Sequence, residues 1–340
     1  MVRKSRTTLM EIAKAANVSA TTVSNVVNGR LDLMSDVTRK RVEAVIQERN
    51  YRPNEGARNL RLSQRRAVGL IVIHDSPTFL ADPMITNIVA GMSNYLGVNG
   101  YGLLLTGSRN AAVDGAQMLR RDQTDAICVI PSGSEGERRT LYNLLADTGQ
   151  PILIFQDKAP DFLSDALSVR QDDFSAGQLI GERLIERGAR RLAFLTPTQS
   201  WPAMASRQAG LEQVAAAAGA DLHIVTAATE RLEDTQIAMG RHIDRMGLPD
   251  AFIGGNDQMA IAALTWALDR NLSVPRDIRI AGFNGFDFSS YVRPTLTTVK
   301  SQAYEMGKQG AAALLARLNG GRFAQSELMF PVELRAGASD

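Results

Sequence analysis

The chain has 340 residues, of which 44% are hydrophobic and 22% are charged, and its formal net charge is +2. This length suits two or three domains with a sizeable core, and no apolar run is long enough to span a bilayer. No apolar signal-peptide segment follows the basic N-terminus, and the single cysteine, Cys128, excludes an intrachain disulfide. We therefore expect a cytoplasmic protein.

The charge is distributed unevenly along the chain. Residues 1–66 carry fourteen lysines and arginines against six acidic residues, a net charge of +8, and the remainder has a net charge of −6. A basic segment attached to an acidic body predicts that the N-terminal part binds a polyanion. On charge alone, a basic solvated tail is the alternative.

The first fifty residues have the pattern of a small helical head. A short helix is predicted over 8–16, with one apolar face formed by Leu9, Ile12, Ala13 and Ala16. The segment 17–19 breaks this helix, and Ser19 is a candidate cap for a second helix over 20–28. In that helix the residues expected to be buried are Val23, Val26 and Val27. Those expected to face outward are Ala20, Thr21, Ser24 and Asn25.

A third helix is predicted to begin at the capping candidate Ser35. Its apolar row is Val42, Val45 and Ile46. Two helices joined by a turn of three or four residues, of which the second is short and polar, are typical of proteins that bind the DNA major groove. The first residues of the second helix then reach base edges, and flanking polar residues contact phosphates.

The run from Glu11 to Gly29 resembles the DNA-binding head of the LacI/GalR family, as does Tyr51-Arg52-Pro53-Asn54 behind the third helix. By this resemblance, residues 1–53 are a helix-turn-helix domain that binds double-stranded operator DNA. The resemblance implies base contacts from Ala20, Thr21 and Asn25. It implies phosphate contacts from Thr22 and Ser24, and Ser19 and Asn28 are also expected to contact DNA. A three-helix module that binds only protein is the alternative.

Residues 54–66 resemble the hinge helix and linker of the same family. So short a helix is marginal alone in water, and in the family it folds on DNA beside its dimer mate. The residues that the resemblance places on DNA are Gly56, Ala57, Leu60 and Arg61, with Leu60 as a wedge between base pairs. A leucine that caps the linker is the alternative. Gly56 departs from the family's usual residue and costs about 1 kcal/mol of helix stability, so we expect a hinge that folds reluctantly.

From residue 67 onward, short apolar strands alternate with amphipathic helices. Strands are predicted at 68–73, 101–106, 126–130, 152–155, 191–196, 222–225, 251–254 and 278–282. Helices are predicted between them, for example at 85–96, 175–187 and 257–270. This pattern predicts an α/β body of two doubly wound parallel-sheet lobes, with a cleft at the carboxyl ends of the strands.

The body resembles the periplasmic-binding-protein-like sensor of the same family. The resemblance predicts an effector-binding and dimerisation domain over 67–340, in which the chain crosses between lobes near 168, 297 and 326. The first lobe would then comprise about 67–168 and 298–325. The second lobe would comprise about 169–297 and 326–340.

The candidate effector-binding residues follow predicted strands or open helices: Asp82, Gln156, Trp201, Arg207, Asn256 and Asn284. Arg207 is expected to open a helix and donate to vicinal hydroxyls or a carboxylate, as the family's arginine does; a surface salt bridge is the alternative. Trp201 offers an aromatic face to a sugar or a base, or anchors its loop. Asn284 and Gln156 stand where the family commonly has aspartates.

Four further residues are expected to have structural or alternative roles. Asp157 is an alternative to Gln156, and Asp257 is expected to cap a helix. His74 lines the cleft or is structural, and Cys128 is expected to be a small core residue.

Several enzyme motifs are absent from the sequence. There is no phosphate-binding or dinucleotide-binding glycine loop, and three dispersed histidines with one cysteine form no visible metal site or nucleophile–base pair. We therefore expect no cofactor and no enzyme activity. A doubly wound enzyme and a periplasmic sugar-binding protein remain weaker alternatives.

The sequence as a whole predicts a homodimeric repressor that a mono- or disaccharide releases from a pseudopalindromic operator. The alternative is a corepressor-dependent repressor or an activator that responds to a nucleobase or another metabolite.

Overall fold

A computed structural model of the chain describes residues 7–27, 30–51, 65–109 and 123–340. The chain divides into two compact units, Met1–Arg65 and Arg66–Asp340. The residues predicted to contact DNA that lie outside the described ranges are Asn28, Gly56, Ala57, Leu60 and Arg61. Within the described ranges, every helix is too short or too polar to traverse a bilayer.

The first unit is a three-helix head. Its elements are α1 (Leu9–Ala15), α2 (Ala20–Val27), the 3₁₀ turn η1 (Leu31–Leu33) and α3 (Asp36–Glu48). Thr8 caps α1 through a reciprocal capping box with Glu11, and Ser35 caps α3 by accepting from the Thr38 backbone N–H, as predicted for Ser35. These caps satisfy backbone donors that would otherwise be unpaired at the helix starts.

The core of the head brings one residue from each helix to its centre. Ile12, Val23 and Val42 are fully buried, and Tyr51 packs against them after α3. The prediction that Val26 and Val27 are buried was wrong in degree, because both are only half-buried at the margin of this small core.

The second unit contains two six-stranded sheets with the same strand order. The first sheet runs β11-β5-β4-β3-β1-β2 and the second runs β12-β10-β9-β8-β6-β7. All neighbouring strands in the described residues are parallel except β10 and β12. The first-sheet strands are β1 (Ala67–Ile73), β2 (Gly102–Ser108), β3 (Ala126–Ile130), β4 (Ile152–Phe155), β5 (Ala166–Gln171) and β11 (Glu327–Phe330). The second-sheet strands are β6 (Arg191–Pro197), β7 (Asp221–Ala227), β8 (Ala251–Gly254), β9 (Arg279–Asn284), β10 (Thr297–Lys300) and β12 (Glu333–Arg335).

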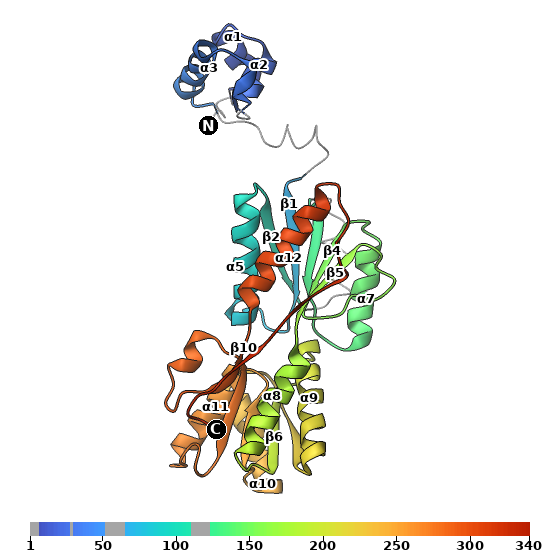
Figure 1. Cartoon of the computed structure of the whole chain (residues 1–340), viewed down its shortest axis with the longest axis vertical. Coiled ribbons are helices and arrows are strands. Elements are labelled where there is room, and N and C mark those ends of the chain that lie inside the picture. The colour runs from blue at the N-terminus through green and yellow to red at the C-terminus, as the bar shows by residue number, and fades with distance from the viewer. Residues whose placement is uncertain (1–6, 28–29, 52–64, 110–122) are drawn as a thin grey trace. The chain divides into compact units, whose positions relative to one another are not determined.

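Helices cover both faces of each sheet. The helices are α5 (Pro83–Val98), α7 (Glu135–Ala146), α8 (Asp173–Glu186), α9 (Pro202–Ala218), α10 (Leu232–Met246), α11 (Asp257–Asp269) and α12 (Ala303–Leu318), with short 3₁₀ turns η2 (Phe79–Ala81) and η3 (Asp287–Ser290). Side chains of β1 alternate between the two faces of the first sheet: Leu70 and Val72 pack towards α5 and α12, whereas Ile71 and Ile73 pack towards α7. Figure 1 shows α5 and α12 against the first sheet and α8 and α9 against the second. The predicted fold class, a helical head and two doubly wound parallel-sheet lobes, is confirmed.

The described chain crosses between the two lobes three times. The crossings lie between β5 and α8, between β10 and α12, and between β11 and β12. Each lies a few residues beyond the predicted positions near 168, 297 and 326, because β5, β10 and β11 first complete their pairing with their own sheets. The predicted lobe boundaries are corrected accordingly.

Candidate functional site

The turn between α1 and α2 shapes the first candidate site. Asn17 adopts a positive φ of 48°, a conformation that asparagine tolerates better than most residues. Ser19 then accepts a hydrogen bond from the Thr22 backbone N–H at 3.1 Å, and the two hydroxyls lie 2.9 Å apart. This cap starts α2 at the residue that the sequence predicted.

The start of α2 presents small polar side chains. Thr21 is exposed, and Ser24 and Asn25 are half-buried. Ala20, which was expected to face outward, is half-buried and packs on the head core, so its side chain is only partly available. The arrangement is that of a short recognition helix behind a tight turn, the geometry that a major groove accepts.

The second candidate site is a pocket between the two lobes of the body. Its space, including the part open to solvent, is about 480 Å³. All six residues that the sequence predicted to bind the effector line it: Asp82, Gln156, Trp201, Arg207, Asn256 and Asn284. The other lining residues are Met84, Ile85, Ile130, Pro202, Ala203, Met204 and Glu230. The pocket thus combines an apolar floor with a few convergent polar groups, as small-molecule sites do.

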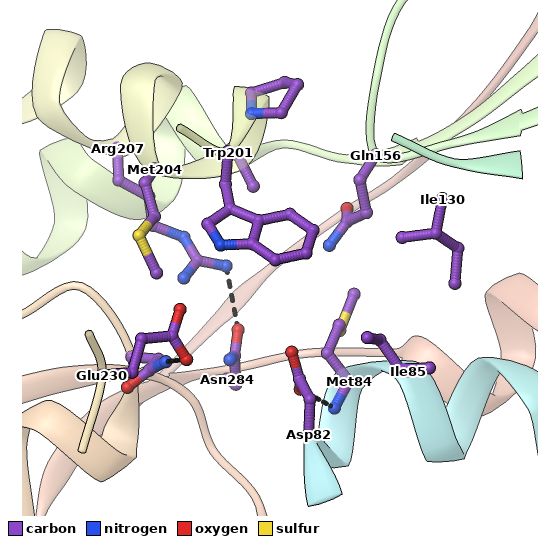
Figure 2. A pocket seen from close by; sticks show the side chains of 13 residues that line it. Asp82, Met84, Ile85, Ile130, Gln156, Trp201, Met204, Arg207, Glu230 and Asn284 are labelled. Carbon is purple, nitrogen blue, oxygen red and sulfur yellow. Dashed lines mark hydrogen bonds between the residues drawn. The ribbon is translucent and has the colours of Figure 1, made fainter. Parts of the chain in front are cut away.

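Figure 2 shows how the two lobes share this pocket. Asp82 and Gln156 come from the first lobe, at the start of α5 and the end of β4. Arg207, Glu230 and Asn284 come from the second lobe, on α9, after β7 and at the end of β9. The lining residues therefore gather at the carboxyl ends of the strands, where ligands bind in open α/β sheets.

Arg207 is the most constrained side chain in the pocket. It is only 3% exposed, and its Nε donates to Asp173 Oδ1 at 2.7 Å. Its terminal nitrogens donate to the Gly255 carbonyl at 2.6 Å and to Asn284 Oδ1 at 2.8 Å. Neither the predicted helix start nor the alternative surface salt bridge holds: Arg207 lies in the second turn of α9 and its ion pair is buried.

Glycines on α8 and α9 bring Arg207 and Asp173 together. A side chain at Gly177 would lie 2.1 Å from the Arg207 carbonyl oxygen, and one at Gly210 would lie 2.2 Å from the Phe174 carbonyl oxygen. The two helix backbones therefore touch, which only glycine permits. This close approach sets the arginine beside its carboxylate.

Asn256, and not Asp257 as predicted, caps helix α11. Asn256 caps α11 by accepting from the Met259 backbone N–H at 3.0 Å, and its amide nitrogen donates to Glu230 Oε2 at 2.9 Å. Asp257 does not cap the helix, because its carboxylate accepts from Thr298 Oγ1 at 2.6 Å and from the Phe286 backbone N–H at 3.1 Å. Burial raises the pKa of Asp257 to about 7.

Gln156 has an unusual environment. It follows β4 with a positive φ of 64°, is 8% exposed, and its Oε1 atom has no hydrogen-bond partner among the described residues. A buried acceptor without a partner is costly, and such strain is concentrated at functional sites. Asp157, the alternative to Gln156, does not line the pocket, because its carboxylate accepts from Arg138 Nε at 2.8 Å and from Tyr142 Oη at 2.5 Å.

Trp201 connects the two lobes across the pocket. It precedes α9 in the second lobe, yet it packs against the hydrophobic core of the first. Its ring meets His74 edge-on, with the ring centroids 5.4 Å apart. His74 itself is not among the lining residues, and its Nδ1 accepts from the Ser76 backbone N–H at 2.9 Å, which supports a structural role.

Glu230 is the functional candidate that the sequence analysis missed. Burial and the nearby charge of Asp82 raise the pKa of Glu230 to about 7. Burial likewise raises the pKa of Asp82, although the backbone N–H groups of Met84 and Ile85 and the charge of Arg207 act against this. Glu230 follows β7 at its carboxyl end, so the rule that identified the other candidates also applied to it.

No metal site is visible in the described part of the chain. Across residues 7–27, 30–51, 65–109 and 123–340, no three histidine, cysteine, aspartate or glutamate side chains are grouped to hold an ion. Cys128 is buried in β3, as predicted for a core residue, and burial raises the pKa of its thiol.

Two family profiles match the chain. Residues 8–54 match "Bacterial regulatory proteins, lacI family", and residues 182–339 match "Periplasmic binding protein-like domain". Among curated relatives, the ribose operon repressor of Bacillus subtilis (strain 168) is 27% identical over 325 residues, covering 96% of each chain. The HTH-type transcriptional repressor PurR of Vibrio atlanticus (strain LGP32) is 27% identical over 316 residues, covering 92% of each chain.

Solved structures have the same fold along nearly the whole chain. The lac repressor dimer bound to operator and the anti-inducer ONPF aligns with a TM-score of 0.85 at 23% identity, covering 98% of this chain and 99% of that one. The transcriptional regulator CelR in complex with cellobiose aligns with a TM-score of 0.71 at 25% identity, covering 98% of this chain and 100% of the other. With its helix-turn-helix head and two-lobed, periplasmic-binding-protein-like body, the chain belongs to the LacI/GalR family of bacterial transcriptional regulators.

Proposed function

We propose that this regulator is a cytoplasmic repressor that binds a pseudopalindromic operator as a homodimer and is released by a small sugar-like effector. The observation that carries the proposal is the pocket between the lobes. The six polar or aromatic residues predicted from the sequence and its family resemblance all line it, and they come from both lobes. A ligand there contacts both lobes at once, so it binds one lobe arrangement better than another and shifts the balance between them.

On the DNA side, we assign recognition to the first residues of α2. Thr21 and Asn25 are proposed to read bases, with Ala20 adding a partly covered methyl group, and Ser19, Thr22, Ser24 and Asn28 are proposed to contact the backbone. Support comes from the Ser19 cap and the exposed Thr21. In this proposal residues 1–53 read the operator, 54–66 form the hinge with Gly56, Ala57, Leu60 and Arg61 on DNA, and 67–340 bind the effector and dimerise.

Coupling between the sites follows from their differential affinities. Effector binding closes the lobes around the pocket, changes the pairing of the two protomers and separates their hinge helices, so operator affinity falls. The coupling is reciprocal, so operator DNA must weaken effector binding by the same factor. Relatives support the choice of a sugar-like ligand, since a ribose operon repressor and a cellobiose-bound regulator are among them.

The test is operator release by the full-length protein. Fluorescence anisotropy of labelled duplexes from the promoter region of the regulator's own operon would be followed while sugars, nucleosides, nucleobases and organic acids are added one at a time. We expect a sugar-like compound to lower operator affinity. Tighter operator binding with a nucleobase, or no response to any compound, would contradict the proposal.

A further inference from the structure

The pocket between the lobes contains more acidic than basic groups. Of its described lining residues, three are titratable: Asp82, Arg207 and Glu230. Arg207 is already paired with the buried Asp173 at 2.7 Å, and this ion pair has no net charge. Among the described lining residues, Asp82 and Glu230 therefore have no cation of their own.

The two carboxylates, both half-buried, line the same pocket and repel each other. Water is partly excluded there, so the interaction is stronger than on the surface. Burial and the charge of Asp82 raise the pKa of Glu230 to about 7, so the negative charge of Glu230 is disfavoured beside Asp82. The groups that face Glu230 are Asp82 at the start of α5, Arg207 on α9 and the Asn256 amide that caps α11. None of these three supplies an unpaired positive charge.

Gln156 supplies a third acceptor that a ligand with hydrogen-bond donors would satisfy. Gln156 is 8% exposed and lines the pocket, and its Oε1 atom has no donor among the described residues. Figure 2 shows its amide on the opposite side of the Trp201 ring from Arg207. The pocket thus offers two carboxylates and an orphaned amide oxygen to whatever fills it. Gln156 Oε1 has no donor among the described residues, and each carboxylate, although it accepts one hydrogen bond from Met84 or Asn256, has further acceptor capacity.

We propose that the effector is a small polyhydroxylated compound that carries a protonated amine, such as an amino sugar, and that its ammonium group binds Asp82 and Glu230. This inference rests on the proposed effector-binding function and names the chemical class of the ligand. The ammonium group has three donors and one positive charge, so it donates to both carboxylates and offsets their negative charge. The hydroxyls are left for Asn284 and Gln156, and the ring for the face of Trp201.

Two other ligand classes fit less well. A neutral sugar supplies donors but no positive charge, so the repulsion between the two carboxylates remains. An amino acid would bring a carboxylate of its own towards Asp82 and Glu230, and the cation that the described lining residues provide, Arg207, is already engaged by Asp173.

Comparing the binding of amino sugars with that of uncharged sugars of similar shape distinguishes these ligand classes. Isothermal titration calorimetry of the full-length protein at pH 7 would compare glucosamine, galactosamine and mannosamine with the corresponding neutral hexoses and with their N-acetyl forms, which keep the size but lose the charge. We expect at least one amino sugar to bind about tenfold or more tightly than both of its uncharged counterparts, the size of effect of one charge-assisted hydrogen bond. Equal or tighter binding of an uncharged counterpart, or no binding of any amino sugar, would overturn the inference.

Variants test whether the carboxylates cause the preference. Glu230→Gln keeps the acceptor for Asn256 but removes the charge, and we expect the preference for the amine to disappear. Glu182→Gln makes the same exchange on an exposed residue of α8 and serves as the control that retains the preference. An amine preference that survives in Glu230→Gln would overturn the assignment. Operator release by a neutral sugar would overturn the charge inference alone, whereas failure of every compound to change operator affinity would count against the proposed function.

Discussion

Replacing Arg207 by alanine tests how the second lobe is held together beneath the pocket. The substitution removes three donors: those to Asp173, to the Gly255 carbonyl and to Asn284. Asp173, 5% exposed, keeps the Gln171 amide as a donor at 2.8 Å but loses its ion-pair partner. Removing one partner of a buried ion pair costs about 3–5 kcal/mol, because the remaining charge is left uncompensated.

The assay is urea unfolding of the full-length protein, followed by tryptophan fluorescence. We expect the free energy of unfolding of the body to fall by about 3–5 kcal/mol in Arg207→Ala. Adding Asp173→Asn to this variant should restore part of the loss, since it removes the stranded charge. Arg241→Ala, at an exposed position of α10, should change stability by less than about 0.5 kcal/mol.

A loss of effector response in Arg207→Ala is interpretable only beside its stability, because Arg207 supports the pocket as well as lining it. A variant whose unfolding free energy stays within about 0.5 kcal/mol of the parent would refute the view that Arg207 is a structural clamp.

Three further predictions concern other parts of the body. Gly177→Ala should destabilise the second lobe by about 1–3 kcal/mol, because the added methyl group would collide with the Arg207 carbonyl oxygen. Gly240→Ala has open space around the added methyl group and should stabilise α10 by up to about 1 kcal/mol. Thermal unfolding of the two variants measures both effects. Asp257 holds its proton to a higher pH when folded, so between its ordinary pKa of 3.8 and about 7 the folded state binds more protons and stability falls as pH rises. Asp257→Asn should make that fall shallower without abolishing it, because the raised pKa of Glu230 contributes a fall of the same sign; urea unfolding at several pH values measures the slope, and an unchanged slope would contradict the prediction. In a Trp266→Phe background Trp201 is the sole tryptophan, and effector binding should change its fluorescence emission. Unchanged emission at saturating ligand would show that Trp201 does not contact the effector.

The strands were predictable wherever burial on both faces made them apolar throughout. The ranges 126–130 and 152–155 match β3 and β4 residue for residue, because every side chain in them is buried. The strands β5, β10, β11 and β12 lie at the junctions between lobes and contain polar residues. In β10, Thr297 and Thr298 are fully buried, but because threonine is polar a search for apolar strands passes over them.

The sequence predicted most of the polar residues that line the pocket, but not the ion pair between Arg207 and Asp173. Asp82 was identified from its place before Pro83, and Asn284 from its place after a predicted strand, where the family commonly has an aspartate. The contact of Arg207 with Asp173, by contrast, joins α8 and α9 through a glycine-mediated approach that no local pattern reveals. Glu230 escaped notice because the predicted strand ended at 225, five residues before it, whereas β7 continues to Ala227.

The proposed function depends most on recognition of a specific duplex by the head. In vitro selection of random double-stranded DNA by the full-length protein tests this directly. We expect enrichment of a pseudopalindrome, with affinity that falls steeply as salt rises and with an altered preferred sequence for Asn25→Ala. Recovery of no common sequence, with equal binding to all duplexes, would contradict the central claim.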